Sequence, residues 1–137
     1  MSVPLADPEI GLGAQENVAQ HGFALQCRVT TEDPTNRFIP DYGRLSHYRS
    51  ASGLGIRLDA GSAFTGAVIT PFYDSLLAKI IVRGASREEA IDRMRRALRE
   101  TVLEGVKTSI PFHLRLLDDP AFQEGHVSKV EMVRRRG

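Results

Sequence analysis

In the stretch Phe23-Ala-Leu-Gln-Cys-Arg-Val-Thr30, apolar and polar side chains alternate from Leu25 onward. Its apolar side chains fall on one side of an extended chain: Phe23, Leu25, Cys27 and Val29. Its polar side chains, Arg28 among them, fall on the other side. Because successive side chains of a strand point to opposite faces, this period of two predicts a strand with one buried face. Residues 31–36 then predict a loop, since they contain Pro34 and Asn36.

Four later segments also have the composition of strands: residues 44–49, 55–59, 64–70 and 75–83. Glycines separate the first three at a spacing that is typical of hairpins. The last segment, Ser75–Arg83, is so rich in Leu and Ile that we expect it to be buried on both faces. The alternative for this segment is a change from helix to strand near Lys79.

Helical signals follow the strands. Ser86 and Glu89 form a capping box, in which each side chain accepts from a free backbone N–H at the start of a helix. Apolar residues then recur at helical spacing: Ile91, Met94, Leu98, Thr101 and Val102. Gly105 is placed to end this helix, and a second helix is expected over residues 111–118, which begin with proline. Short strands in the N-terminal two thirds, followed by two or three helices, predict an α+β fold with an antiparallel β-sheet.

Length and charge limit the classes of function. The 137 residues suit one domain, and residues 1–20 are interpreted as a linker because prolines and glycines interrupt them. A net charge of +1 and the lack of a long apolar run predict neither a nucleic acid nor a membrane as partner. Cys27 is the only cysteine, and residues 1–10 do not resemble a secretory signal. We therefore expect a reducing, cytoplasmic location.

Short motifs for nucleotide, metal and nucleophile chemistry are missing from the sequence. It contains no glycine-rich phosphate loop and no Gly-x-Ser-x-Gly elbow. One cysteine cannot supply a cysteine-based zinc site, and the four histidines do not have metalloprotease spacing. The chain is therefore expected to hold no metal and no nucleotide cofactor.

Longer blocks of sequence are more informative than these short motifs. Seven blocks occur in a fixed order: Gln26-Cys-Arg-Val-Thr-Thr-Glu-Asp-Pro34, Phe38-Ile-Pro40 with Gly43, Gly53-Leu-Gly-Ile-Arg57, Pro71-Phe-Tyr-Asp-Ser-Leu-Leu-Ala-Lys79, Arg87-Glu-Glu-Ala90, Met94-Arg-Arg-Ala-Leu98 and Gly105-Val-Lys-Thr-Ser-Ile-Pro-Phe112. In order and spacing this set resembles the C-terminal domain of biotin carboxylase, and it is most like the pyruvate carboxylase branch. On this resemblance we place the domain at residues 21–127. Residues 128–137 depart from the family and are interpreted as a divergent tail.

The resemblance implies a part of an enzyme. Biotin carboxylases, which are ligases, use ATP and bicarbonate to carboxylate biotin that a separate carrier domain holds. In the family, N-terminal and ATP-grasp domains bind ATP and Mg²⁺, so we expect this domain to be inactive alone and to work within a homodimeric enzyme. Three alternatives stay open: a non-catalytic dimerisation or interaction module, a truncated fragment, and a domain of an acyl-CoA or urea carboxylase.

Two residues match positions at the family's biotin site. Arg28 matches an arginine that faces the ureido group of biotin, where a guanidinium stabilises negative charge on the ureido oxygen during carboxylation. Asp74 matches a nearby aspartate that can orient Arg28 or the ureido N–H. From periodicity alone, Arg28 is more simply explained as a solvated or ion-paired strand residue. Asp74 is equally well explained as a turn or helix-cap residue.

Leu54 and Arg57 fall where the family places contacts of its homodimer, and an arginine beside an apolar side chain suits an interface. The alternative is a pair of hairpin residues without a partner. Cys27 has no identifiable partner histidine and is interpreted as a small buried side chain. Lys79 and Lys107 are interpreted as structural or solvated. The four arginines between residues 93 and 99 predict a solvated helix face.

Overall fold

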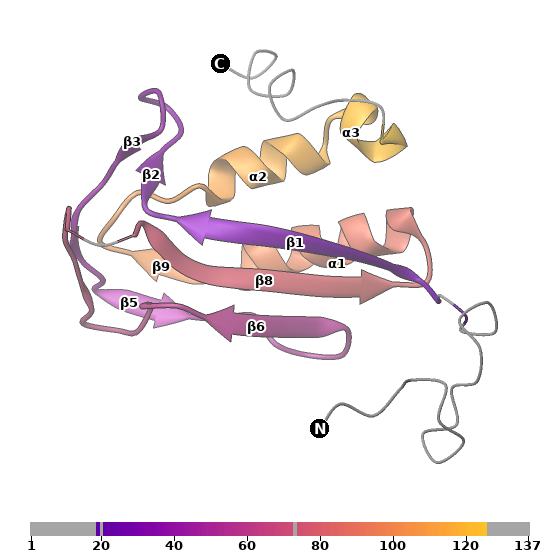
Figure 1. The fold of residues 1–137 in the computed structure, drawn as a ribbon, viewed down its shortest axis with the longest axis horizontal. Helices are drawn as coiled ribbons and strands as arrows, with labels where there is room; N and C mark the ends of the chain where they lie inside the picture. The colour runs from indigo at the N-terminus through magenta and orange to yellow at the C-terminus, as the bar shows by residue number, and fades with distance from the viewer. Residues whose placement is uncertain (1–18, 20, 73, 126–137) are drawn as a thin grey trace, which may run out of the picture.

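A layer of helices covers one face of a three-stranded sheet (Figure 1). The computed structural model describes residues 19, 21–72 and 74–125. Its elements are, in chain order, β1 Phe23–Thr30, β2 Glu32–Asp33, β3 Ile39–Pro40, β4 Gly43–Arg44, β5 His47–Arg49, β6 Ile56–Ala60, β7 Val68–Ile69, β8 Leu76–Gly84, α1 Arg87–Glu100, β9 Val102–Glu104, α2 Ile110–Leu117 and α3 Pro120–Glu124. This arrangement confirms the predicted α+β fold. The predicted linker and the tail at 128–137 lie outside the described residues, apart from Ala19.

The central sheet has the strand order β1–β8–β6, and both pairings are antiparallel. Cys27 of β1 and Leu58 of β6 both lie opposite Ile80 of β8, so side chains from all three strands meet on one face. The strand β8 continues through Lys79 without a break, which excludes the alternative of a helix in its first half.

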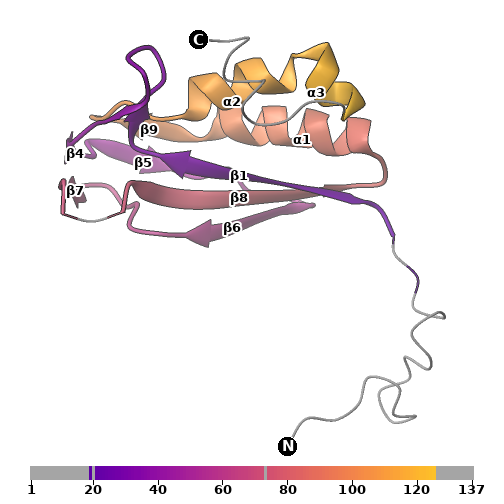
Figure 2. The same cartoon turned by 45° about the horizontal axis from the view of Figure 1, so that its top comes forward.

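The expectation that β8 is buried on both faces holds only at its start, where the adjacent residues Leu77 and Ala78 are both buried. Further along, only one face of the strand is fully buried. Ile80 and Val82 face the helices and are each 1% exposed. On the opposite face Lys79 and Ile81 are only partly buried, and Arg83 is exposed. The physical reason is that the helices lie together on one side of the sheet (Figure 2). Among the residues that the structure describes, no second layer covers the other side of the sheet.

Three two-stranded ladders continue one end of the fold: β2–β3, β4–β7 and β5–β9. The predicted strand at 44–49 is therefore divided between two ladders, and only the short β7 pairs within the predicted strand at 64–70. The division occurs at Leu45, whose side chain is fully buried and whose N–H donates to the Ala67 carbonyl at 2.9 Å. The strand predicted at 44–49 is therefore interrupted at Leu45, where the side chain enters the core.

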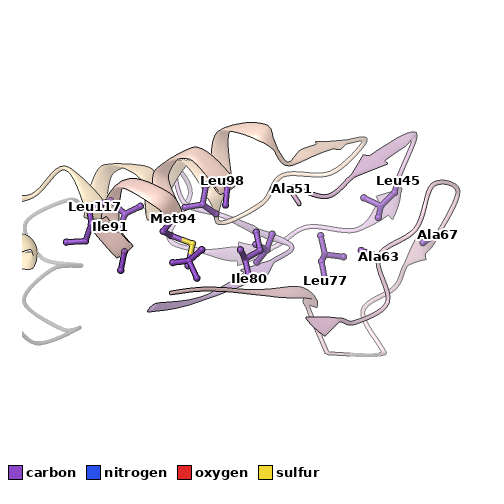
Figure 3. Close-up of a cluster of buried hydrophobic side chains, with 14 of the residues drawn as sticks. Leu45, Ala51, Ala63, Ala67, Leu77, Ile80, Ile91, Met94, Leu98 and Leu117 are labelled. Carbon is purple, nitrogen blue, oxygen red and sulfur yellow. The ribbon is translucent and has the colours of Figure 1, made fainter. Parts of the chain in front are cut away.

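Helix α1 begins at the predicted cap residue Ser86, but Glu89 reaches back to the N–H of Ala85 rather than to that of Ser86, as a standard capping box would require. Ser86 Oγ accepts from Glu89 N at 3.2 Å, and Glu89 Oε2 accepts from Ala85 N at 2.7 Å. Five residues of the helix are buried against the sheet: Ala90, Ile91, Met94, Ala97 and Leu98. Figure 3 shows Met94 and Leu98 in the same cluster as Ile80 of β8. Each large apolar side chain buried there stabilises the fold by roughly 1.5–3 kcal/mol.

Helix α1 ends earlier than predicted. The last helical residue is Glu100, and Thr101 has an extended backbone from which the chain continues as β9. Val102, which the prediction placed in the helix, instead lies in β9 and pairs with Arg49 of β5. Gly105 follows β9 and has a φ of +107°, where an added Cβ would collide with the Arg44 carbonyl oxygen. Glycine is therefore required at residue 105. The reason is the close approach of two segments of the chain, at residues 105 and 44, and not the end of a helix.

Helices α2 and α3 pack beside α1. Helix α2 lies within one residue of the predicted 111–118. Asp119 caps α3, because its Oδ1 accepts from Ala121 N at 2.9 Å. At the start of α1, the Arg87 guanidinium donates to the Phe122 carbonyl at 2.6 Å and lies over the Phe122 ring at 5.2 Å. Arg87 thus connects α3 to α1.

Candidate functional site

A pocket of about 620 Å³ lies beside β1. It is formed by β1, the β2–β3 hairpin, the residues just before β8 and the start of α2. Its lining residues are Gln26, Arg28, Thr30, Glu32, Phe38, Asp74, Ser75, Ser109, Phe112 and His113. The fold therefore brings Arg28 and Asp74 together, as the resemblance implied. Leu54 and Arg57 are not part of this pocket.

Arg28 reaches the pocket because of its position in the alternation of β1. Cys27 and Val29 belong to the core, so Arg28 lies on the other face of the strand and is exposed. Its neighbour across the sheet is Lys79. Within the described part of the chain, only its backbone carbonyl makes a hydrogen bond outside the sheet, and its guanidinium has no carboxylate partner. The pocket thus contains a permanent positive charge with free hydrogen-bond donors.

Asp74 opens the turn that leads into β8. Its Oδ1 accepts from Leu76 N at 3.0 Å, which is the turn role expected for such an aspartate. The next residue, Ser75, donates from Oγ to Glu32 Oε1 at 3.4 Å. Asp74 and Glu32 therefore place two carboxylates in the same pocket as Arg28. The turn role of Asp74 is compatible with a second role towards a ligand.

Two aromatic rings form an apolar wall of the pocket. Phe38 and Phe112 meet edge to face, with ring centroids 5.0 Å apart and ring planes at 89°. Phe38 and its neighbour Arg37 have φ values of 57° and 54°, a left-handed conformation that costs non-glycine residues about 1 kcal/mol each. The Phe38 N–H donates to the Asp33 carbonyl at 2.8 Å and holds this turn closed. The strained turn is what places the Phe38 ring against Phe112.

Asp33 ties the β2–β3 hairpin to the loop before α2. Its Oδ2 accepts from Lys107 Nζ at 2.7 Å, and its Oδ1 accepts from Thr35 Oγ1 at 2.6 Å. These hydrogen bonds, with that from Lys107 the strongest, lower the pKa of the Asp33 carboxyl from 3.8 to about 2. Lys107 also donates its backbone N–H to Asp41 Oδ2 at 2.7 Å. Of the two interpretations of Lys107, the structural one is therefore supported.

Residues at the start of α2 form hydrogen bonds with the backbone along the free edge of β1. Ser109 N donates to the Thr30 carbonyl at 3.0 Å, and Thr30 N donates to Ser109 Oγ at 3.0 Å. Ser109 Oγ in turn donates to the Arg28 carbonyl at 3.2 Å. One helical turn later, His113 Nε2 lies 2.9 Å from the same carbonyl oxygen and must be the donor, because a carbonyl can only accept. Burial lowers the pKa of His113, which favours its neutral form.

The two predicted dimer residues lie at the other edge of the sheet. Leu54 is in the turn before β6, and its side chain is 92% exposed. Arg57 is on β6 and pairs with Asp59 of the same strand at 3.0 Å. Both residues are accessible to a partner, and their place in an interface stays a prediction.

Three further features bear on the chemistry of the chain. Burial raises the pKa of the Cys27 thiol to about 12, so Cys27 is not a thiolate nucleophile near neutral pH. Within residues 19, 21–72 and 74–125, no group of three His, Cys, Asp or Glu side chains is arranged to hold a metal ion. None of the helices in those ranges is long and apolar enough to cross a membrane.

Several pocket residues were not singled out from the sequence: Glu32, Phe38, Ser109, Phe112 and His113. Phe38 and Phe112 lie in blocks that carried the resemblance, so their importance was signalled, but their contact was not. In the sequence, His113 is one of four histidines without metalloprotease spacing, and nothing else marks it. Residues 28 and 113 are 85 positions apart, and no local pattern connects them.

Comparisons with known proteins agree on one family of domains. The family model described as "Biotin carboxylase C-terminal domain" matches residues 26–133. The mitochondrial pyruvate carboxylase of Mus musculus is 52% identical over 120 residues, which cover 88% of this chain. The pyruvate carboxylase of Aspergillus terreus is 50% identical over 118 residues, or 86% of this chain. In both cases the chain spans only 10% of the length of the relative.

Solved structures give the same result. A Rhizobium etli pyruvate carboxylase structure with acetyl coenzyme-A superposes with a TM-score of 0.85 and 48% identity, covering 92% of this chain and 12% of that one. The biotin carboxylase domain of a thermophilic 2-oxoglutarate carboxylase superposes with a TM-score of 0.79 and 40% identity, covering 84% of this chain and 26% of that one. The chain therefore belongs to the biotin carboxylase C-terminal domain family.

Proposed function

We propose that this chain forms one wall of the biotin site in an ATP-dependent biotin carboxylase of the pyruvate carboxylase type. The observation that carries the proposal is the guanidinium of Arg28, which lines a pocket without a carboxylate partner among the described residues. A solvated surface arginine needs no pocket, and a structural arginine has a partner. An unpaired guanidinium that faces a pocket of this size suits a ligand that brings its own electron-rich oxygen.

The pocket fits the ureido group of biotin in three respects. Arg28 offers donors for the ureido oxygen, Asp74 offers an acceptor for an N–H, and the Phe38–Phe112 wall offers a surface for the apolar ring. Bound biotin would supply the nitrogen that is carboxylated. Arg28 would stabilise negative charge on the ureido oxygen, where that charge is largest in the transition state. Lys79, opposite Arg28 on the sheet, adds a second positive charge nearby.

The rest of the reaction would belong to other domains. The chain spans about a tenth of its curated relatives, and one solved relative is a biotin carboxylase domain dimer in complex with MgADP and bicarbonate. We infer that an N-terminal and an ATP-grasp domain bind ATP and Mg²⁺, that a carrier domain brings biotin, and that this domain is inactive alone. We infer a cytoplasmic location from the sequence alone, because a single cysteine suits a reducing compartment. Pyruvate as the final acceptor is favoured over an acyl-CoA or urea by the curated relatives.

A complementation assay tests the proposal. The chain is mixed with the N-terminal and ATP-grasp fragment of a pyruvate carboxylase, and ADP release is measured with bicarbonate, with and without biotin. We expect biotin-dependent turnover only in the mixture, and a loss of about 100-fold or more with Arg28→Ala. Arg99→Ala is the matched control, because Arg99 is an exposed arginine on α1 outside the pocket. Equal turnover with Arg28→Ala and wild type would contradict the assigned role of Arg28.

The alternative of a dimerisation module rests on a different observation, the 92% exposure of Leu54. A large apolar side chain at the tip of a turn suits a contact with a second copy. In this version the folded chain would self-associate and the mixture would show no biotin-dependent turnover. Sedimentation velocity at several concentrations tests this alternative, since a strict monomer would exclude the interaction module.

A further inference from the structure

We propose that Ser109 and His113 are positioning residues for Arg28. They would bind the backbone carbonyl of Arg28 from the start of α2. This would fix the backbone position from which the Arg28 side chain extends into the pocket. This inference rests on the proposed function of Arg28. It assigns a role to two residues whose local sequence carries no catalytic motif.

Strand β1 lies at the edge of the central sheet, with β8 on one side only. An edge strand leaves N–H and C=O groups unpaired along its outer side. At the pocket these groups belong to Arg28 and Thr30, and Ser109 pairs with them in place of another strand. It donates N–H to the Thr30 carbonyl at 3.0 Å and accepts from Thr30 N through Oγ at 3.0 Å. Ser109 is 4% exposed, so this pairing is shielded from water.

The backbone carbonyl of Arg28 accepts from two side-chain donors. Ser109 Oγ lies at 3.2 Å and His113 Nε2 at 2.9 Å, and a carbonyl oxygen has two lone pairs to offer. The two donors are four residues apart and therefore lie on the same face of the first turn of α2. Together they restrict the backbone at Arg28, which sets the direction of its side chain.

The side chain of Arg28 is less restrained than its backbone. Its guanidinium has no hydrogen-bond acceptor among residues 19, 21–72 and 74–125, so the position of its tip depends on its backbone. A long side chain loses considerable entropy when it is fixed by a ligand, and a restrained backbone reduces the motion that has to be lost. The ring of His113 is itself supported by Phe112, at a centroid distance of 5.9 Å.

Two substitutions at residue 113 separate a positioning role from packing. His113→Leu keeps the apolar volume and removes the donor, whereas His113→Gln keeps a side-chain N–H donor. Ser109→Ala removes the second donor but leaves the backbone bond to Thr30. Arg115→Ala is the matched control, because Arg115 is an exposed residue of α2 outside the pocket. Thermal unfolding of each variant establishes that it is folded.

The direct readout is the Nε–H NMR signal of Arg28 in the isolated chain, assigned by its absence in Arg28→Lys. Biotin should shift this signal in the wild type, and pentanoate, which lacks the ureido group, should not. We expect His113→Leu and Ser109→Ala to raise the biotin concentration at half-saturation by about three- to tenfold. His113→Gln should restore most of the loss, and Arg115→Ala should behave as wild type.

The complementation assay gives a second readout. The same two variants should raise the KM for biotin or lower the biotin-dependent kcat, while the KM for ATP stays unchanged. A wild-type chain whose Arg28 signal ignores biotin would contradict the proposed function, and the inference with it. A wild-type response that is unaltered in His113→Leu and in Ser109→Ala would overturn the inference alone.

Discussion

Apolar contacts hold α1 on the central sheet, whereas polar side chains hold the pocket end of the molecule. Under α1 the largest core side chains are almost fully buried, with Met94 at 0% and Leu98 at 1% exposure. At the pocket, the α2 start and the β2–β3 hairpin are fixed by hydrogen bonds, such as Ser109 to Arg28 and Asp33 to Lys107. The comparison teaches that stability and ligand geometry come from separate regions. Each region can therefore be perturbed alone.

The largest effect is expected in the apolar region. Met94→Ala should lower the free energy of unfolding by about 2–5 kcal/mol, because it removes a fully buried side chain and leaves a cavity between α1 and β8. Urea unfolding with an unchanged m-value would measure this loss. The folded fraction should keep the response of Arg28 to biotin. A variant that stays as stable as wild type would contradict the account of the core.

The next largest effect is expected where β4 meets the loop after β9. Gly105→Ala should destabilise the protein by about 1–3 kcal/mol, because φ is +107° and the new Cβ would meet the Arg44 carbonyl. Gly66→Ala is the matched control, since Gly66 has a similar φ of +92° but no atom within 4 Å of an added Cβ. The difference in unfolding free energy between the two variants isolates the steric cost. Equal losses would show that the close crossing at residue 105 is unimportant.

A smaller effect, visible mainly in acid, is expected for the hairpin anchor. The folded pKa of Asp33 is about 2 and its ordinary value is 3.8, so its contribution to stability is present above pH 3.8 and is lost as pH falls towards 2. Lys107→Met should raise that folded pKa and so flatten the fall in stability between these pH values. Urea midpoints measured across this range test the change, with Arg115→Met as control. A fall as steep as that of the wild type would contradict the assigned pairing.

The smallest effect on stability is expected at the far edge of the sheet. Leu54→Asp should leave the unfolding free energy almost unchanged, because the side chain is 92% exposed. If Leu54 belongs to a homodimer contact, the same substitution should weaken self-association in sedimentation velocity. Self-association that survives Leu54→Asp and Arg57→Ala would place the contact elsewhere.

The two regions also differ in how far the sequence predicts them. The alternation in β1 and the capping box at Ser86 are local signals, and both elements formed as predicted. The end of α1 was not predicted, because the partner of β9 is the distant β5. Propensity alone does not reveal such a long-range pairing. Local sequence pattern thus predicts the strands and helix of the apolar region. It does not predict element ends that depend on pairing with a distant strand.

The pocket depends almost entirely on long-range contacts. The family blocks located Arg28 and Asp74 within one site, although no spacing rule connects them. The roles of Ser109 and His113 could not be predicted, because they consist of bonds to a backbone carbonyl more than 80 positions away. Side chains that act on backbone groups leave no motif in the sequence.

The most direct measurement of the central claim is a biotin titration of the isolated chain, followed through the Arg28 Nε–H signal. The account predicts a saturable shift with biotin, none with pentanoate, and no biotin-induced change elsewhere in the pocket when Arg28 is replaced by alanine. Arg99→Ala should titrate as the wild type does. A folded wild-type chain whose Arg28 signal does not respond to biotin would contradict the claim.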